Sequence, residues 1–252
     1  MTDEAAASEP GSFGAGSFGA GSCEAESLKP ESFEAVVFDM DGVLTDSEGW
    51  WDEVRRDLAA QAGRPWPAEA TAAMMGMSTP EWSRYLVETV GIGGTASEAA
   101  RATIEAMAER YREHLPLLPG AIEAVRRMAR ARKVGLASSS PRVLIDTVLD
   151  RAGLADVVQV SVSTEEVAAG KPAPDGYARA CELLGVDPGH AFAVEDSTNG
   201  ILSAHAAGLV VIAAPTPFHP PRPEVAALAA ATIGGLDELT EELLARLTPR
   251  AS

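Results

Sequence analysis

Two aspartates, Asp39 and Asp41, stand one residue apart directly after the apolar run Ala35–Phe38. A short apolar run rich in Val and Phe is typical of a buried strand in a parallel sheet. Asp39 would then lie at the carboxyl end of that strand, where open α/β sheets bind their ligands. Two carboxylates at this place suit a divalent cation, a nucleophile or an acid–base pair. The alternative is a strand that simply ends in an Asp-Gly turn at Gly42.

Three further groups of polar residues follow later apolar runs or precede helices. Ser138 and Ser139 follow one such run, and their hydroxyls and amides would hold a phosphate at the start of the next helix. Lys171 lies between a glycine and a proline and would neutralise phosphate charge or pair with Asp39. A helix-capping serine and a solvated loop lysine are the alternatives for these residues.

Glu195 and Asp196 follow the apolar run 191–194 as two adjacent acids. Burying two carboxylates is costly unless a cation or a basic partner compensates them. We therefore expect a Mg²⁺ site formed by Asp39, the backbone carbonyl of Asp41 and Asp196. Glu195 is an additional candidate ligand. Oxygen ligands of this kind suit a small hard cation.

The order of these groups assembles the parts needed to transfer a phosphoryl group to a carboxylate. Asp39 would attack phosphorus, while Asp41 would protonate the leaving oxygen and later activate water. Lys171, Ser138 and Ser139 would stabilise the equatorial oxygens.

Alternating strands and helices must position these residues. From residue 119 onward, strands are predicted at 134–137, 157–162, 191–194 and 209–213, with helices between them and a terminal helix at 236–247. This alternation indicates an α/β fold with a Rossmann-like parallel sheet. Between the first strand and the rest, residues 48–116 are predicted to be helical, with Ser47 capping the first helix.

The predicted domains follow from this pattern. Residues 1–32 repeat Gly, Ser and Ala and are expected to be a disordered tail. Residues 33–47 and 117–248 would form the sheet core, and residues 48–116 a helical cap inserted after the first strand.

Composition narrows the possible partners and the compartment. A net charge of −17 disfavours binding to nucleic acid or to an anionic membrane. Two cysteines are too few for a disulfide framework, no apolar run approaches the roughly 20 residues of a membrane span, and the acidic first residues do not resemble a signal peptide. We expect a cytoplasmic protein that acts as a monomer.

Four stretches in this order resemble the haloacid dehalogenase-like superfamily, in its beta-phosphoglucomutase-like phosphatase branch with a helical cap. They are Phe38 to Leu44, Leu136 to Ser140, Gly170 to Asp175, and Val194 to Ser197 with Gly200. The resemblance covers about residues 33–247. It implies a Rossmann-like core, dependence on Mg²⁺, and hydrolysis of a small phosphomonoester through an aspartyl-phosphate on Asp39.

Departures from the branch favour a phosphatase over its relatives. Similar mutases carry a cap histidine where this chain has Trp50 and Trp51, and a cap arginine near Thr79. Phosphonate-cleaving relatives need a cap lysine, and residues 48–116 contain none; dehalogenating relatives lack the second aspartate, Asp41. The prediction is a phosphatase acting on a sugar phosphate or similar metabolite. A phosphomutase and a non-catalytic sensor of a phosphorylated ligand are the alternatives.

Selection of the substrate is expected to fall to the cap. Trp51, Met77 and Thr79 are the predicted specificity residues, and further candidates in the same segment are Trp50, Arg55, Arg56, Met74, Met75, Trp82 and Arg84. Packing of the Trp and Met residues within helices, and solvation of the arginines, is the alternative.

Overall fold

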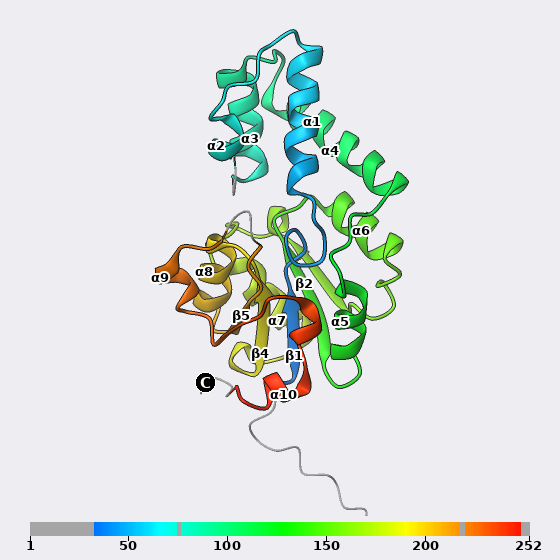
Figure 1. Cartoon of the computed structure of the whole chain (residues 1–252), viewed down its shortest axis with the longest axis vertical. Helices are drawn as coiled ribbons and strands as arrows, with labels where there is room; N and C mark the ends of the chain where they lie inside the picture. The colour runs from blue at the N-terminus through cyan, green and yellow to red at the C-terminus, as the bar shows by residue number, and fades with distance from the viewer. Residues whose placement is uncertain (1–32, 75–76, 217–219, 248–252) are drawn as a thin grey trace, which may run out of the picture. The chain divides into compact units, whose positions relative to one another are not determined.

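The computed structural model describes residues 33–74, 77–216 and 220–247. The predicted tail at 1–32, and Met75 with it, lie outside the described residues. In the described part of the chain, six parallel strands form one sheet in the order β3-β2-β1-β4-β5-β6 (Figure 1). The strands are β1 (Ala35–Phe38), β2 (Lys133–Ser138), β3 (Val160–Ser163), β4 (Ala191–Glu195), β5 (Val210–Ala213) and β6 (Ala231–Thr232). The predicted parallel α/β sheet is confirmed.

Strand β1 occupies the point where the strand order reverses. Its last residue, Phe38, pairs with Leu136 of β2 on one side and with Val194 of β4 on the other. The next residue, Asp39, still donates its backbone N–H to the Val194 carbonyl at 3.0 Å. At such a reversal, the crevice outside the carboxyl ends of the strands is the usual ligand site of an open α/β sheet.

Helices connect the strands and also fill the long segment between β1 and β2. That segment contains α1 (Glu48–Gln61), α2 (Ala70–Met74), α3 (Thr79–Tyr85), the π-helical turn Leu86–Val90 and α4 (Ala96–Glu113). The other helices are α5 (Ala121–Met128), α6 (Arg142–Arg151), α7 (Asp175–Leu184), α8 (Thr198–Ala206), α9 (Pro223–Ala226) and α10 (Glu241–Leu244).

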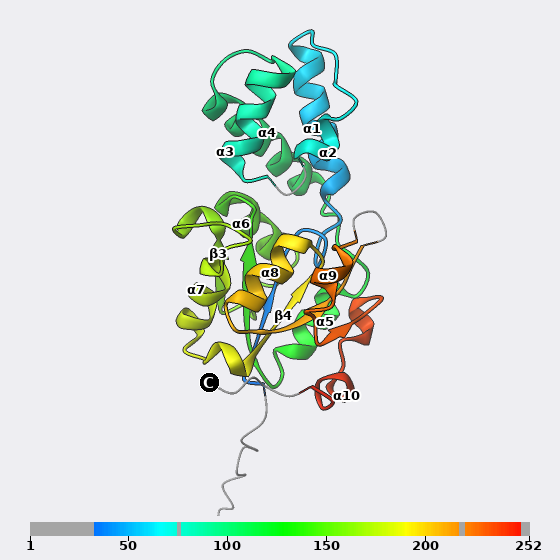
Figure 2. The same cartoon turned by 90° about the vertical axis from the view of Figure 1, so that its left-hand side faces the viewer.

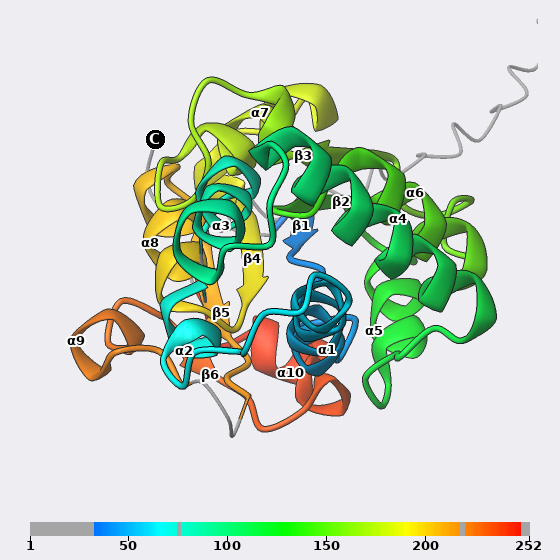
Figure 3. The ribbon, with the colours of Figure 1, turned by 90° about the horizontal axis from the view of Figure 1, so that it is seen from above.

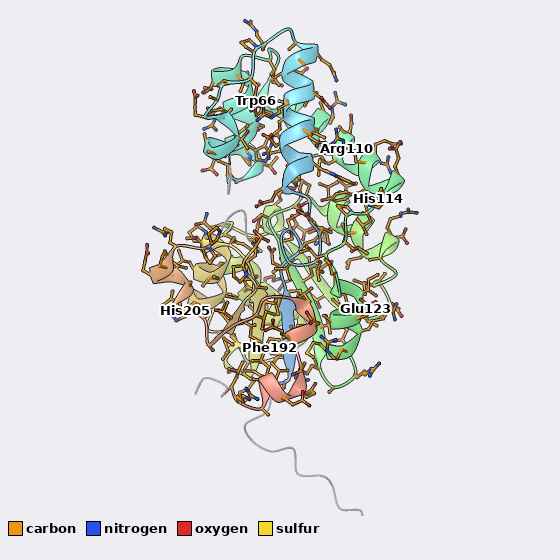
Figure 4. The ribbon with its side chains drawn as sticks, in the orientation of Figure 1. Trp66, Arg110, His114, Glu123, Phe192 and His205 are labelled. Carbon is orange, nitrogen blue, oxygen red and sulfur yellow. The ribbon has the colours of Figure 1, made fainter. Side chains whose placement is uncertain are left out.

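Two helical layers cover the two faces of the sheet. Alternate residues of a strand point to opposite faces. On β1, Val36 and Phe38 belong to the apolar cluster that includes residues of α5 and α6, whereas Ala35 and Val37 belong to the cluster that includes residues of α7 and α8. Figure 3 shows these two helix pairs on opposite sides of the sheet, and Figure 4 labels Phe192, the β4 residue that pairs with Val36 in the first cluster. All four residues of β1 are buried, which explains its uninterrupted apolar sequence.

The helical segment between β1 and β2 has an apolar cluster of its own. Met74, Trp82 and Leu86 are buried in it, and Trp66 packs against them (Figures 2 and 4). The last helix of the segment, α4, instead places Tyr111 in the cluster of β1. The segment is therefore packed independently at α2 and α3, and continuously with the sheet layer at α4.

The predicted terminal helix at 236–247 is wrong. The chain there forms a short 3₁₀ turn, Leu236–Glu238, and then the four-residue helix α10. Thr240 separates them because its backbone is extended and its hydroxyl accepts a hydrogen bond from the Leu243 N–H, as a helix N-cap does. The apolar residues keep a helical spacing across this break, so the sequence pattern did not indicate it.

No helix within the described ranges has both the length and the apolarity that a bilayer span requires.

Candidate active site

Asp39 and Lys171 form a buried ion pair at the carboxyl end of β1. The Lys171 ammonium donates to Asp39 Oδ1 at 2.7 Å and to Glu195 Oε1 at 2.6 Å. Asp39 is 6% exposed and Glu195 is fully buried. The structure thus brings together three predicted residues that are distant in sequence, since β1 and β4 are adjacent and the loop with Lys171 precedes α7.

Glu195 is held by five hydrogen bonds. Its Oε1 accepts from Lys171 and from the Tyr177 hydroxyl at 2.9 Å. Its Oε2 accepts from the backbone N–H groups of Asp196 and Ser197 and from the Ser197 hydroxyl, at 3.0 to 3.1 Å. A Cβ at Gly200 would come within 1.7 Å of Glu195 Oε1, so only glycine fits beside this carboxylate. Glu195 therefore holds Lys171 in place beside Asp39.

The carboxylates outnumber the basic groups at this end of the sheet. Burial raises the pKa of Asp39 to about 7, against the opposing effect of Lys171. Burial, followed by the charges of Glu195 and Asp39, raises the pKa of Asp196 to about 9. Burial alone would lower the pKa of Lys171, but the two carboxylates that it contacts raise it above its ordinary value. When all three buried carboxylates are ionised, the single ammonium leaves an excess of negative charge.

A divalent cation fits this excess charge. One oxygen from each of Asp39, Glu195 and Asp196 lies within 4.8 Å of the others. Asp196 Oδ1 is buried and has no hydrogen-bond partner among the described residues. Gly42, at φ 83°, leaves the room that this carboxylate occupies, because a Cβ there would lie 2.1 Å from Asp196 Oδ2. Asp39 and Asp196 thus offer buried carboxylate oxygens with few internal donors, which suit a hard cation such as Mg²⁺, whereas both oxygens of Glu195 already accept hydrogen bonds.

Asp41 is fixed by hydroxyl groups and not by charge. The Ser140 hydroxyl donates to its Oδ2 at 2.6 Å, and Thr45 and Tyr111 donate to its Oδ1 at 3.3 and 3.4 Å. The Ser47 hydroxyl also donates to Oδ1 and makes no capping bond to α1, so the predicted capping role of Ser47 is wrong. Burial, and then Asp41, raise the pKa of Tyr111, which keeps its phenol protonated as a donor.

The two predicted phosphate-binding serines differ in their surroundings. Ser138 is fully buried, and its hydroxyl accepts from the Ser140 N–H at 3.0 Å. Ser139 is exposed and lines a cavity of about 990 Å³, together with Asp39, Asp41, Lys171 and Asp196. Ser139 is thus in reach of a ligand in the cavity, whereas Ser138 stabilises the turn that carries Ser139 and Ser140.

The predicted specificity residues lie on two cavities. Met77 and Thr79 line the first cavity. Trp51 lines a second cavity of about 530 Å³, which Asp41, Met77, Thr79 and Ser139 also line. Trp50 lies instead against Tyr111 and His114.

Three residues of the site were not found by sequence reasoning: Ser140, Tyr111 and Tyr177. Ser140 is the third of three consecutive serines, and nothing in that run marks the one that reaches Asp41. Tyr111 lies 70 residues from Asp41 on a helix whose pattern indicated only packing. For Tyr177 there was a signal, its place on the first turn of the helix that follows Lys171.

Comparison with known proteins gives consistent matches. The family of haloacid dehalogenase-like hydrolases matches residues 33–208. Hexitol phosphatase B of Escherichia coli (strain K12) is 34% identical over 214 residues, which cover 82% of this chain and 94% of that protein. A phosphorylated carbohydrates phosphatase of Thermotoga maritima is 33% identical over 177 residues, covering 70% and 82%. The crystal structure of CbbY from Rhodobacter sphaeroides in complex with phosphate is similar with a TM-score of 0.73 at 26% identity, covering 82% of this chain and 96% of that one.

Proposed function

Since the chain belongs to the haloacid dehalogenase-like hydrolases and is a phosphoric monoester hydrolase, we propose that it hydrolyses a small sugar or polyol phosphate. The reaction would pass through an aspartyl-phosphate and require Mg²⁺. One observation carries the proposal. Asp39, paired with Lys171, and Asp41, held by hydroxyl groups, line the same cavity. The names of the two phosphatase relatives support the substrate class.

In the first half of the reaction, a carboxylate oxygen of Asp39 forms a bond to phosphorus as the ester oxygen leaves. Asp41 gives that oxygen its proton, so the product is a neutral alcohol. In the second half, Asp41 takes a proton from water as the water oxygen bonds to phosphorus, and the Asp39 carboxylate is released with inorganic phosphate. Asp39, Asp196 and the backbone carbonyl of Asp41 would hold Mg²⁺, whose positive charge would reduce the repulsion between an anionic nucleophile and an anionic phosphate.

The other predicted residues divide between contact and positioning. Lys171 and Ser139 would face the phosphoryl oxygens, since both line the cavity. Because both oxygens of Glu195 are occupied by five donors, we assign it to positioning Lys171. Ser138 would help to position Ser140, because its hydroxyl accepts a hydrogen bond from the Ser140 N–H.

We further propose that residues 48–116 act as a cap over the core of 33–47 and 117–248. The two connections between these parts are hydrogen-bonded to each other: Asp46 N–H donates to the Pro116 carbonyl at 2.7 Å, and Leu118 N–H to the Leu44 carbonyl at 2.9 Å. Paired connections of this kind suit a hinge. Closure at this hinge would exclude water from the phosphoryl group.

The test is the release of inorganic phosphate from a panel of sugar, polyol and small organic phosphates, with and without MgCl₂. The proposal expects free phosphate in equal amount to the dephosphorylated alcohol, and only with the metal. Accumulation of an isomeric sugar phosphate without free phosphate would instead favour the phosphomutase alternative. Phosphate release that is equally fast without a divalent cation would contradict the metal assignment.

A further inference from the structure

Arg55 lies over two indole rings in the helical segment. Its guanidinium carbon is 5.1 Å from the centroid of the Trp51 ring and 4.9 Å from that of the Trp82 ring. Stacking of this kind restrains the plane of a guanidinium and leaves its N–H groups at the edge for other acceptors. Arg55 Nε is buried and has no hydrogen-bond partner among the described residues.

The neighbouring arginine is different. Arg56 donates from Nε to Asp52 at 2.5 Å and from Nη2 to Thr71 at 3.0 Å, so its contacts are internal to the segment. The other oxygen of Asp52 accepts from the Thr71 hydroxyl. Asp52 is therefore already engaged by other donors. A buried donor without a partner is costly, and a ligand oxygen would satisfy it.

Arg55 faces the cavity that continues to the reacting groups. Arg55, Trp51 and Trp82 line the cavity of about 530 Å³, which Asp41 and Ser139 also line. A substrate whose phosphate meets Asp39 can thus extend along this cavity toward Arg55.

The charges around this cavity decide which chemical group Arg55 would meet. Among the described residues that line the two cavities, Lys171 and Arg55 are the only basic ones. Lys171 is already paired with two carboxylates. The acidic residues that line the second cavity are Asp41, Asp46, Glu48 and Asp52. A second phosphate group, with close to two negative charges, would face a single guanidinium among these acids. A neutral hydroxyl oxygen accepts a hydrogen bond from the guanidinium without that repulsion.

We propose that Arg55 is a specificity-determining residue that donates to an uncharged hydroxyl oxygen at the end of the substrate remote from the phosphate, so that the cavity selects sugar or polyol monophosphates against bisphosphates. The proposal rests on the proposed function and names its substrate class more narrowly. Burial lowers the pKa of Arg55 to about 10, so the side chain is still charged at neutral pH.

The experiment compares Arg55→Met and Arg55→Lys with the control Arg101→Met, whose side chain pairs with Glu105 and lines neither cavity, all as full chains with MgCl₂. The probes are acetyl phosphate, which has no hydroxyl group for Arg55 to recognise, the 6-phosphates of glucose, fructose, sorbitol and mannitol, and fructose 1,6-bisphosphate. For the best hexose or hexitol phosphate, Arg55→Met raises KM by about tenfold to a hundredfold, the loss of one hydrogen bond from a charged donor. Hydrolysis of acetyl phosphate stays within about twofold, which also reports that the variant is folded.

The remaining results separate the possible failures. Arg101→Met leaves the hydrolysis of both kinds of substrate unchanged, and Arg55→Lys falls between wild type and Arg55→Met because it keeps the charge without the planar fork. Wild type prefers fructose 6-phosphate to the bisphosphate, and Thr79→Arg, which adds a cation to both cavities, narrows that preference several-fold. An unchanged KM in Arg55→Met, an equal loss with acetyl phosphate, a preference for the bisphosphate, or no hexose or hexitol phosphate better than acetyl phosphate would overturn the inference. If wild type leaves acetyl phosphate intact as well, the proposed function itself fails.

Discussion

The carboxyl end of the sheet and the aromatic cluster of the helical segment each hold one basic residue, but in opposite ways. Lys171 makes two ion pairs of 2.6 and 2.7 Å, and one partner, Glu195, accepts four further hydrogen bonds. Arg55 contacts ring faces, and its Nε has no partner among the described residues. Groups with complete internal hydrogen bonding keep one geometry, whereas a stacked group with an unsatisfied donor can accept a ligand. Changes at the first site should therefore affect every substrate, and changes at the second should alter the choice among substrates.

The largest expected effect is at Asp39. Asp39→Asn keeps the shape of the side chain but removes the carboxylate that we propose as the nucleophile, so turnover of acetyl phosphate and of sugar phosphates should fall together by about 10⁴-fold or more. Phosphate release measures the loss, and thermal unfolding should show that the fold persists. Turnover above about a tenth of wild type would show that Asp39 is not the nucleophile.

Removal of the metal should come next. Dialysis against a chelator should abolish activity on every substrate, and MgCl₂ should restore it, because the excess negative charge of the three carboxylates then has its counter-ion. Apart from activity, saturating MgCl₂ should raise the unfolding temperature of wild type, since a ligand that binds only the folded state stabilises it. Asp196→Asn should lose this shift, whereas Asp52→Asn, outside the cluster, should keep it. An equal shift in both variants would place the cation elsewhere.

The ion pair at the sheet predicts a change in stability as well as in rate. Lys171→Met leaves Asp39 and Glu195 without the ammonium that both contact, and removing one partner of a buried pair costs about 3–5 kcal/mol of unfolding free energy. Denaturant unfolding without metal measures this loss. The double variant with Glu195→Gln should recover part of it, because one uncompensated carboxylate is then gone. A single variant within about 1 kcal/mol of wild type would contradict this account of the site.

The smallest effects are expected among the hydroxyl groups around Asp41. Ser140→Ala removes the 2.6 Å donor and should lower kcat by about tenfold, whereas Tyr111→Phe removes a 3.4 Å contact and should lower it less. Both losses should fall on kcat, in contrast with Arg55→Met, and should be smaller for acetyl phosphate, because acetate leaves without the proton that the alcohol of a sugar phosphate takes from Asp41. Thr147→Ala, whose hydroxyl bonds within α6, is the control. A loss in KM alone, with kcat unchanged, would assign Ser140 to substrate binding and not to the support of Asp41.

The sequence was sufficient for the sheet and for the residues that follow its strands. Buried parallel strands have continuous apolar sequences, and their carboxyl ends meet at one edge, so the sequence alone predicts that Asp39, Lys171 and Asp196 lie together. The direction of a side chain within a turn was not predictable in this way. Ser47 has the type and place of a helix cap, yet its hydroxyl donates to Asp41. The same limit applies to Ser140.

Contacts between segments far apart in sequence were not predictable from local sequence patterns either. The helical spacing of apolar residues around Tyr111 predicts that its ring is buried. It does not predict that the hydroxyl at the end of the ring donates to Asp41. Arg55 was a candidate for recognition, and its stacking on Trp51 and Trp82 depends on how α1 packs against α3, which no local rule specifies. Candidate recognition residues of an inserted segment are therefore harder to find than candidate catalytic residues at a sheet edge.

The two connections that flank residues 48–116 have a consequence for how such chains diversify. Thr45 bridges to Leu117, and hydrogen bonds join Asp46 to Pro116 and Leu118 to Leu44, so the segment leaves the sheet core and returns to it at neighbouring points. An exchange of everything between these points would leave the ends of β1 and the start of α5 where they are. We expect that the corresponding segment of a relative can be grafted here as a unit, and that the chimaera would keep its reaction while inheriting the donor's choice of substrate.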